Sequence, residues 1–557
     1  MMIHIFPVAA QENDAVVAIS FLLAKDPEEL TEDEVDQLSG LLKRKILLNE
    51  ATREELYSCG ILTRYQVASL LDYRERSGAC MSFLELASLD GFTQDFVDRI
   101  KPFVTLESYP ELKGRLDNEF TARASLRSTT EQTRYGYTSR YKLKYGDALK
   151  ASLACSRALD AKTGFPDAIC GSIETQFKRF PASLIIGDFN ARFGQGLAMW
   201  TGSDFTSLNT PSAFMKRHFG VTSSTSYTGT NVYTGLAGKI ALRDMSISAY
   251  VAMPGIKTLR TSPQNFRVQP ALNMNYSWRF GQAGLSHMLE FGGFGREVYI
   301  PAMKTSCDFL LCVKGIDVFS EFMYNWVNRR PSAVAGVVFP VNDVWNLAAM
   351  LRSHDSEHKI AVSSGMNNRK KLNGAVSTEA VLYTIPKDDS QSRSLQLKFH
   401  SQWQYMLSNQ FQLTLRFTER IRSWGHMFRT DLRSDLSWKS DMFLITLRLN
   451  VLQCDNYSFL AYIEGGYKHE KMSVYLRQGV FFIDDWDDRI YAYERDVPGA
   501  YNSPAFYGRG VWTSLMSSWK LTGWCRLYFR AGYTSYPFMQ EKKPGKAELR
   551  FQSVFDF

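Results

Sequence analysis

The sequence predicts an all-β transmembrane antiparallel barrel of roughly 18–24 strands with a small all-α domain at its N-terminus. Three observations lead to this class. Apolar and polar residues alternate with a period of two through most of the chain after about residue 115, the chain ends on an aromatic strand-like segment, and the residues before 104 carry helical spacing instead. The expected domains are therefore residues 15–104 and 115–557.

The composition excludes two other classes. Hydrophobic residues make up 45% of the 557 positions and charged residues 22%, which is too apolar for a chain disordered throughout. The mean hydropathy is −0.23 and no apolar run reaches about 18 residues, so a bundle of transmembrane helices is excluded. Residues 1–104 carry 10 basic and 18 acidic side chains, and the rest of the chain carries 55 and 39. These opposite net charges indicate two modules.

Residues 1–14 have the character of a signal-peptide remnant. Met1–Val8 is mostly apolar, and the small pair Ala9-Ala10 follows before Gln11, as at a cleavage site. No lysine or arginine precedes the apolar stretch, so the segment is atypical, and a frayed terminus is the alternative.

The helical domain at residues 15–104 contains a duplicated pattern. An amphipathic helix over residues 30–48 is followed by two copies of a helix, a tight turn and a second helix. Gly60 and Gly91 stand in the turns, where a positive φ is needed.

The two copies resemble the tandem helix-hairpin-helix domain of the competence DNA receptor family over roughly residues 46–104. The resemblance rests on Asn49, Ala51, Glu55, Leu56, Gly60, Ile61, Tyr73, Arg74, Gly78, Phe83, Glu85, Leu86 and Gly91. It implies that backbone amides at the hairpin turns bind a DNA phosphate at a helix N-terminus. The implied phosphate-contacting residues are Gly60, Ile61, Leu62, Arg64, Gly91, Phe92 and Thr93.

Two departures from the family pattern weaken the DNA-binding interpretation. The second glycine of each hairpin is replaced, by Leu62 in the first and Thr93 in the second, so a side chain stands where a phosphate must approach. The domain is also acidic, whereas duplex binding draws most of its affinity from cations. We therefore expect a structural or protein-docking role and keep DNA as a disfavoured partner.

The barrel strands are predicted from alternation. In residues 395–405, 411–418 and 443–451, leucines, phenylalanines and other apolar residues hold one phase while charged and amide residues hold the other. No helical pattern separates the strands, so a parallel α/β sheet is excluded. The polar residues of each strand are suited to face a water-filled lumen, and the apolar residues are suited to face lipid. Trp200, Tyr462, Trp486, Tyr533 and Tyr536 are candidates for interfacial girdles.

The last strand is the sharpest feature of the barrel region. Phe551, Phe555 and the terminal Phe557 share one phase. This resembles the C-terminal strand signal of bacterial outer-membrane barrels, which ends in an aromatic residue. An ordinary last strand ending in phenylalanine is the alternative. A closed barrel also satisfies the rule that no backbone group faces lipid unpaired.

A glycine-rich motif lies in the first part of the barrel. Its sequence, GDFNARFGQGLAMW, contains Gly187, Asp188, Gly194, Gln195 and Gly196. It resembles a motif of large Gram-negative outer-membrane barrels that also carry an N-terminal helix-hairpin-helix region, which implies architecture and location rather than activity. The glycines indicate a bend or bulge where another backbone comes close. A phosphate nest is the alternative, without the lysine that completes a nucleotide-binding loop.

The sequence offers no catalytic residue, metal site or cofactor, so an enzyme is not expected. His354 and His358 have a zinc-compatible spacing only on a helix, and an exposed loop is favoured there. The aspartates at 484, 485, 487 and 488 are either a calcium loop or a solvated acidic loop. Two cysteine pairs, 155 with 170 and 307 with 312, could close short loops, although packed thiols are favoured.

We expect an outer-membrane barrel whose periplasmic helical module plugs the pore or docks a partner, in transport or in an outer-membrane assembly. The expected partners are outer-membrane lipid and a periplasmic or outer-membrane protein. DNA binding or uptake through the hairpins is the alternative.

Overall fold

A computed structural model describes most of residues 15–557. The predicted signal-peptide remnant at residues 1–14 lies outside the described residues. The other residues outside it are 24–26, 31, 44, 60, 108–115, 131, 147, 162–163, 178–179, 203–207, 217, 228–231, 255–266, 279, 295–296, 314, 343, 369–370, 386–392 and 541–542.

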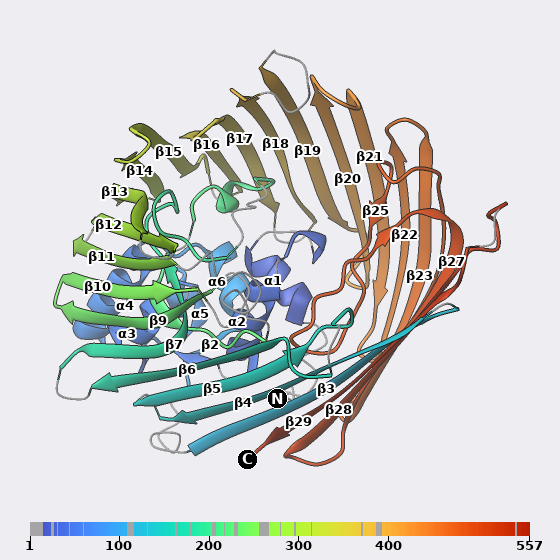
Figure 1. Cartoon of the computed structure of the whole chain (residues 1–557), viewed down its shortest axis with the longest axis horizontal. Coiled ribbons are helices and arrows are strands. Elements are labelled where there is room, and N and C mark those ends of the chain that lie inside the picture. Colours follow the sequence, from blue (N-terminus) through green and yellow to red (C-terminus); the bar gives the residue numbers. More distant parts are fainter. Residues whose placement is uncertain are drawn as a thin grey trace.

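The strands of the described residues close one antiparallel barrel (Figure 1). The short strand β8 (Gly220–Ser223) pairs only with the end of β7, while β7 and β9 pair directly, so 24 strands form the ring. The predicted antiparallel barrel is confirmed, at the upper limit of the expected strand number. The 24 strands are β3 (Leu116–Thr129), β4 (Thr133–Tyr145), β5 (Leu149–Arg157), β6 (Ala168–Phe177), β7 (Ala182–Arg192), β9 (Tyr233–Leu242), β10 (Met245–Met253), β11 (Arg267–Trp278), β12 (Gly281–Phe294), β13 (Glu297–Val313), β14 (Ile316–Asn325), β15 (Arg330–Pro340), β16 (Trp345–His354), β17 (Glu357–Asn368), β18 (Leu372–Tyr383), β19 (Ser394–Met406), β20 (Phe411–Arg422), β21 (Phe428–Lys439), β22 (Phe443–Gln453), β23 (Tyr457–Lys468), β24 (Met472–Ile483), β27 (Gly508–Lys520), β28 (Cys525–Ser535) and β29 (Lys546–Asp556).

The ring closes between the first and last strands. β29 pairs with β3 in a continuous antiparallel register, in which Phe551 lies opposite Ala124. β3 begins, and β29 ends, at one rim of the barrel, which we call the terminal end, and the other rim is the opposite end.

The apolar residues of the strands face outward and the polar residues face the lumen, as the alternation in the sequence predicts. On β22, Leu447 and Leu449 point outward and are 41% and 44% exposed, whereas Arg448 and Asn450 point into the lumen and are buried. The same division holds on β10 and β14. An outer surface of exposed leucine, isoleucine, valine and phenylalanine is what a lipid-facing barrel requires.

The girdle expectation was wrong for three residues. Tyr462 is buried in the lumen because it falls on the inward phase of β23. Trp200 lies beyond the end of β7 in a connection that enters the lumen, and Tyr536 packs against the buried cluster around Phe481.

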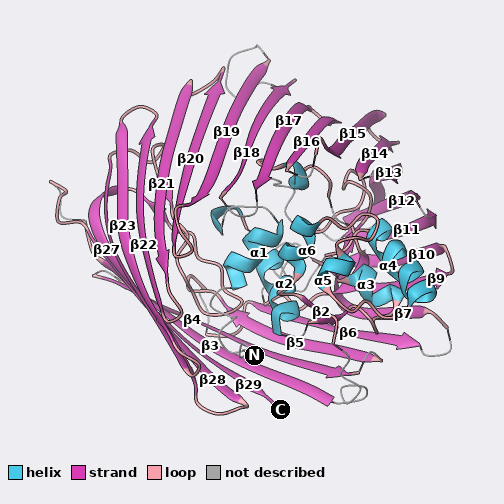
Figure 2. Cartoon of the chain, turned by 180° about the vertical axis from the view of Figure 1, so that it is seen from behind, coloured by secondary structure: helices cyan, strands magenta, loops and turns pink. Residues whose placement is uncertain are grey.

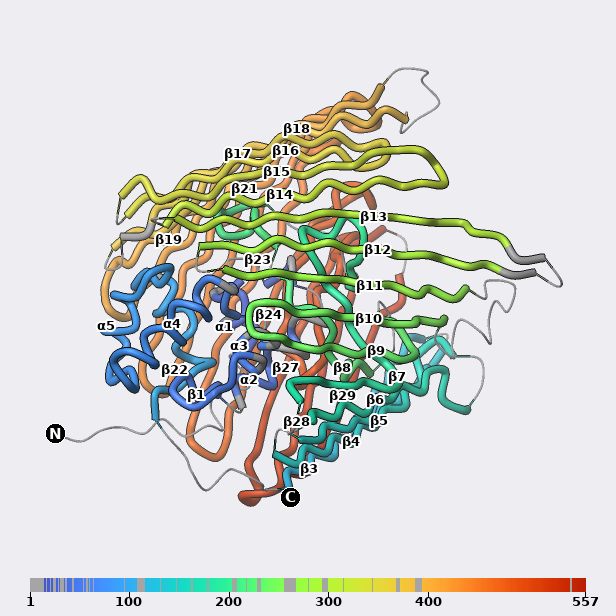
Figure 3. Tube along the Cα trace, turned by 90° about the vertical axis from the view of Figure 1, so that its left-hand side faces the viewer, coloured from blue at the N-terminus to red at the C-terminus, as the bar shows by residue number. Residues whose placement is uncertain are grey.

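The N-terminal residues form short helices that lie inside the ring of strands, as both views along the barrel show (Figures 1 and 2). The side view places them toward one end of the barrel (Figure 3). No helix in the described part of the chain has the length and apolarity needed to cross a membrane. The helices are α1 (Ala15–Leu23), the 3₁₀ turn η3 (Pro27–Glu29), α2 (Glu32–Lys43), α3 (Arg53–Ser58), α4 (Arg64–Ser77), α5 (Phe83–Leu86) and α6 (Gln94–Ile100).

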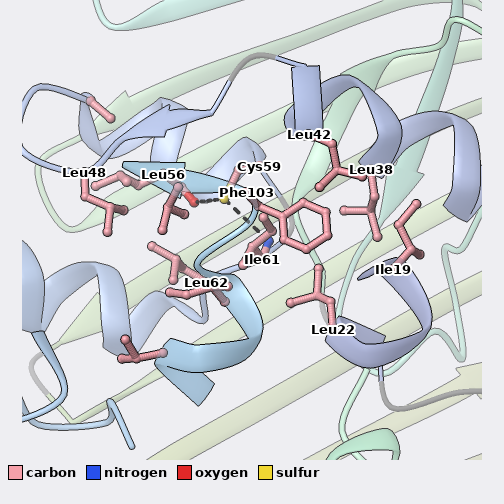
Figure 4. Close-up of a cluster of buried hydrophobic side chains, with 14 of the residues drawn as sticks. Ile19, Leu22, Leu38, Leu42, Leu48, Leu56, Cys59, Ile61, Leu62 and Phe103 are labelled. Carbon is pink, nitrogen blue, oxygen red and sulfur yellow. Dashed lines mark hydrogen bonds between the residues drawn. The ribbon is translucent and has the colours of Figure 1, made fainter. Parts of the chain in front are cut away.

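These helices share a hydrophobic core of their own (Figure 4). Ile19 and Leu22 of α1 pack with Leu38 and Leu42 of α2 and with Phe103, and all five side chains are buried. The strands β1 (Ile46–Leu47) and β2 (Val104–Thr105) pair in parallel and so bring together the two ends of the segment that contains α3 to α6. The sequence predicted a helical domain here but not helix α1, whose nearly uniform apolarity hides any helical period.

Two long connections enter the lumen from the opposite end. The first inner loop spans residues 193–232 and includes the 3₁₀ turn η5 (Pro211–Ala213). Its Phe193, Leu197 and Phe214 pack against the inward-facing Phe319 and Met323 of β14. The second inner loop spans residues 484–507 and contains the short strand pair β25 (Ile490–Tyr491) and β26 (Ala505–Phe506). The two inner loops therefore fill the lumen from the opposite end, while the N-terminal helices lie in it toward the terminal end.

Candidate functional site

A carboxylate of the N-terminal segment is held between two arginines of the barrel wall. Glu28 of η3 lies with its Oε1 2.6 Å from Nη1 of Arg448 and its Oε2 3.2 Å from Nη1 of Arg433. All three side chains are only 8% exposed. The backbone N–H of Tyr493, in the second inner loop, also donates to the Glu28 carboxylate at 3.3 Å. The N-terminal segment, the barrel wall and the second inner loop thus meet at the Glu28 carboxylate.

The surroundings of Glu28 favour its ionised form. Burial by itself would raise the pKa of its carboxyl, but the guanidinium groups of Arg433 and Arg448 lower that pKa well below its ordinary value. Asp435 of β21 accepts hydrogen bonds from both arginines, at 2.7 and 2.6 Å from their Nε atoms. These four groups place two negative charges beside two positive charges, which is the arrangement that offsets the cost of burying charge.

Further contacts connect the helices to the barrel. The hydroxyl of Tyr501 donates to the carbonyl of Pro27 at 2.8 Å, and Tyr493 and Tyr501 pack against the helical core. At the terminal end, Arg53 of α3 donates to the Arg243 carbonyl and lies 3.6 Å from Asp244 in the β9–β10 turn. The helical segment is therefore attached to the barrel wall midway along β21 and β22, and again at the rim of the terminal end.

A series of ion pairs attaches the second inner loop to the wall. Arg477 of β24 and Arg495 of the loop both contact Glu464 of β23. Arg530 of β28 contacts Glu494 of the loop at 2.5 Å. Arg550 of β29 contacts Asp496, whose side chain is fully buried. In most of these pairs the wall supplies the arginine and the loop supplies the carboxylate. The ion pairs therefore fix the position of the loop relative to the wall.

The glycine-rich motif binds a carboxyl group of the chain itself. The backbone N–H groups of Gln195 and Leu197 donate to Oε2 of Glu321, at 2.7 and 3.1 Å. Glu321 lies on β14 and is buried. Gly194 has φ +56°, and a Cβ there would stand 2.8 Å from the same carboxylate oxygen. The sequence left open a bend or a phosphate nest, and the nest is occupied by a carboxylate of the chain itself.

The other motif residues join β7 to its neighbours. A Cβ on Gly187 would come within 2.1 Å of the Gly171 carbonyl, so only glycine fits. The side chain of Asp188 accepts a hydrogen bond from the Gly171 N–H at 2.8 Å and one from the Thr234 hydroxyl at 2.5 Å. The Lys216 N–H donates to the Gln195 side chain at 3.0 Å. Together they fix the point where β7 leaves β9 and enters the lumen.

The hairpin residues that the resemblance implied for phosphate binding are mostly buried or engaged. Ile61, Leu62 and Phe92 belong to the helical core. Thr93 is exposed, but its hydroxyl accepts a hydrogen bond from the Phe96 N–H and so caps α6. Gly91 has φ +81°, as its turn requires. Gly60 lies outside the described residues, and Arg64 is the first residue of α4. The DNA-contacting roles of these residues stay predictions.

The C-terminal residues face outward beside the closing seam. Phe551 and Phe557 are exposed, and Phe555 stacks on Phe120 of β3 at 6.3 Å between ring centroids. Their outward phase matches the sequence-based expectation, while recognition by an assembly machinery stays a prediction.

The histidine and aspartate motifs form no metal site within the described residues. His354 lies opposite Glu357 and His358 opposite Ser353 across a tight β-hairpin, so the two imidazoles point to opposite faces. Asp484 pairs with Arg509, Asp487 with His426, and Asp488 accepts the backbone N–H of Asp455. No disulfide joins the eight cysteines, all of which lie in the described residues.

Sequence reasoning missed the Glu28 cluster. Glu28 stands in an acidic stretch that is typical of a solvated helix, and nothing near it marks one carboxylate as buried. The wall arginines left a weak signal, because Arg433, Arg448 and Arg477 occupy the lumen phase of three long strands, β21, β22 and β24.

Comparison with known proteins gives a general likeness only. No protein-family model matches the chain, and no curated protein matches it. Among solved structures, the siderophore receptor PirA of Pseudomonas aeruginosa is similar with a TM-score of 0.41 at 8% identity, covering 80% of this chain and 81% of that one. The copper transporter OprC has a TM-score of 0.37 at 8% identity and covers 81% and 82%. OccK3 of P. aeruginosa has a TM-score of 0.32 at 8% identity and covers 79% and 95%. At these values the likeness carries no inference about what this chain binds or transports.

Proposed function

We propose that this chain is an outer-membrane barrel in which the N-terminal helical segment serves as a plug, and that passage through the barrel requires its displacement. The observation that carries the proposal is Glu28, a carboxylate of the N-terminal segment buried between Arg433 and Arg448 of the wall. The plug would enter from the periplasm, because the termini of such barrels lie on that side.

The mode of attachment supports a displaceable plug. The segment supplies the hydrophobic core of its own helices, so displacement would separate it from Tyr493 and Tyr501 of the second inner loop and leave the packing among its own helices intact. Polar contacts join it to the wall: the Glu28 cluster midway along β21 and β22, and the Arg53 contact at the rim. Polar contacts exchange for water at a modest net cost once both partners are hydrated. A transported ligand or a periplasmic protein partner would supply the free energy of displacement.

Conductance across a planar lipid bilayer tests this function. The purified full-length chain should give low conductance, and Glu28→Gln should give more frequent large openings, because the two arginines lose their countercharge. Glu75→Gln is the matched control, since Glu75 lies on α4 of the same segment and is exposed. A stable large conductance of the unaltered chain would overturn the proposal. So would identical behaviour of the two variants.

DNA uptake remains the alternative, and the burial of Leu62 in the helical core gives it no support. It predicts that the full-length chain binds duplex or single-stranded DNA with an affinity that falls steeply with salt. We expect no such binding in a salt titration that starts at low ionic strength. Binding with a steep negative slope would make DNA uptake the leading hypothesis.

A further inference from the structure

Three arginines of the barrel wall lie beside one another near the opposite end of the lumen. They are Arg420 and Arg422 of β20 and Arg429 of β21, and Arg420 lies directly opposite Arg429 in the register of the two strands. Arg416, on the same phase of β20, lies opposite the lumen-facing Arg433, so Arg420 and Arg422 also face the lumen. In both views along the barrel, β20 lies on the side of the ring away from α3 and α4 (Figures 1 and 2). We call these three side chains the arginine cluster.

No carboxylate of the described residues forms an ion pair with the arginine cluster. The two carboxylates that attract Arg420 through space are Glu379 of β18 and Asp431 of β21, and each pairs with another cation. Glu379 lies 3.3 Å from Lys359, and Asp431 lies 3.5 Å from Arg416. A lumen surface on which several positive charges lie together without paired carboxylates attracts anions.

The cluster lies between the attachments of the two inner loops. On one side, Lys398 of β19, which lies opposite Arg420, donates to the side-chain oxygen of Asn209 in the first inner loop at 3.0 Å. On the other side, Arg429 donates to two backbone carbonyls of the second inner loop. Arg429 is therefore committed to the fold, and Arg420 and Arg422 are the members to consider for binding.

Arg420 and Arg422 keep donors that the described part of the chain does not use. The Nε atom of Arg420 is buried and has no hydrogen-bond partner there. Arg422 donates from its Nε to the side-chain oxygen of Gln396 at 3.1 Å, which orders the side chain and leaves both of its Nη groups to other acceptors. A buried N–H without a partner is rare in folded proteins because it is costly. An oxygen of a bound ligand would satisfy it.

Two aromatic rings border the cluster. Trp424, in the turn between β20 and β21, lies with its ring centroid 5.6 Å from the guanidinium carbon of Arg422. Its ring meets that of Tyr383 of β18 edge-on, with 5.5 Å between the centroids. Apolar surface beside a charged group lowers the local dielectric constant and strengthens the attraction of that group for an anion. The same rings offer contact to the carbon skeleton of a ligand.

The spacing of the two arginines favours a ligand with two acidic groups. Arg420 and Arg422 are two positions apart on one strand, so their Cα atoms are about 6.6 Å apart on the same face. A guanidinium binds one carboxylate through two parallel hydrogen bonds. A ligand with two carboxylates on a short carbon chain can therefore engage both arginines at once.

We propose that Arg420 and Arg422 form a binding site for a small dicarboxylate that reaches the lumen from the opposite end. One carboxylate accepts hydrogen bonds from Arg420 and the other from the Nη groups of Arg422, while Trp424 and Tyr383 contact the carbon chain. Arg422 is the last residue of β20, so the site lies close to the rim. Binding does not depend on displacement of the plug, so bilayer conductance and a binding measurement test the two proposals separately.

Calorimetric titration of the full-length chain in detergent micelles with succinate tests the proposal. The chain should bind succinate saturably, and Arg420→Gln should weaken the binding by at least about tenfold, which corresponds to about 1.4 kcal/mol. Absence of saturable binding up to about 10 mM succinate would overturn the proposal. At the same ionic strength, acetate should bind at least about tenfold more weakly, because it engages one arginine only. Equal affinity for acetate and succinate would rule out a site for two carboxylates.

Arg352→Gln is the matched control. Arg352 shares the lumen phase of the buried Ala348 and Met350 on β16 and lies toward the same end of the barrel. Four strand spacings separate β16 from β20, or about 19 Å. This variant should bind succinate as the unaltered chain does. Equal weakening by Arg352→Gln and Arg420→Gln would show that only the general charge of the lumen matters, and would overturn the proposal.

A second variant protects the test against misfolding. Arg420 has Lys398, Arg422 and Arg429 as neighbours, so Arg420→Gln removes repulsion between like charges and should not impair folding. If it nevertheless loses the heat-modifiable gel mobility of a folded barrel, Arg422→Gln replaces it, with the same expected tenfold loss of affinity. Unchanged succinate binding by folded Arg422→Gln would contradict the proposed site.

Discussion

The two inner loops fill the same lumen by different physical means. The first is held by apolar packing around Phe193, Leu197 and Phe319, and by backbone amides around Glu321. The second, with Glu28 beside it, is held by ion pairs with arginines of β21–β29. Apolar packing is insensitive to salt and pH, whereas charge clusters depend on the protonation of each member. We therefore expect the ion pairs of the second inner loop to respond to pH and salt more than the apolar contacts of the first.

The largest effect is expected from breaking the apolar side. Phe319→Ala removes a fully buried ring from the cluster around the first inner loop. Substitutions of this kind cost about 3–5 kcal/mol through lost burial and the cavity left behind. Urea denaturation in detergent micelles measures the loss of stability, with the exposed Phe322→Ala on the same strand as control. Equal stability of the two variants would mean that the apolar packing around Phe319 does not hold the first inner loop in the lumen.

The charged side should respond differently to single and double changes. Arg448→Met leaves Glu28 and Asp435 short of a countercharge and should destabilise the chain by about 3 kcal/mol in the same measurement. Adding Glu28→Gln to Arg448→Met should recover much of that loss. No recovery in the double variant would mean that Arg448 acts by packing rather than through its charge.

A smaller effect is expected at the glycine motif. Gly194→Ala would place a Cβ 2.8 Å from the Glu321 carboxylate at φ +56°. The strain should lower the free energy of unfolding by about 1–3 kcal/mol, and the barrel should stay closed. Gly425→Ala is the control, because its φ is +59° and nothing lies within 4 Å of the added carbon. A cost no greater than that of Gly425→Ala would show that only the backbone angle matters.

The smallest effect is a dependence on pH. The pKa of Glu28 is lower in the folded chain than in the unfolded chain, so its contribution is present above the unfolded pKa and is lost as pH falls through the folded pKa. Openings in bilayer conductance should therefore become more frequent in acid, and Glu28→Gln should remove that dependence. An acid response that persists in Glu28→Gln would assign the effect to another group.

The sequence predicts the barrel well because each strand carries its own signal. The alternation of residues such as Leu447 and Arg448 depends only on which side of one strand meets lipid. Closure between β3 and β29 follows from the need to pair every edge.

The contents of the lumen could not be predicted in the same way. Glu28 and Arg448 are 420 residues apart, and their contact depends on how the N-terminal segment lies inside the ring. Gln195 and Glu321 are likewise 126 residues apart. The glycines at 187, 194 and 196 revealed a close backbone approach, but nothing in them showed that the approaching group is a carboxylate.

The seam between β3 and β29 also constrains the order of assembly. The ring closes only when β29, its last strand, pairs with β3. Arg433 and Arg448, which hold Glu28, lie on β21 and β22 and take no part in that seam. The N-terminal segment can therefore dock on an open, curved sheet, and the wall can close around it without any threading.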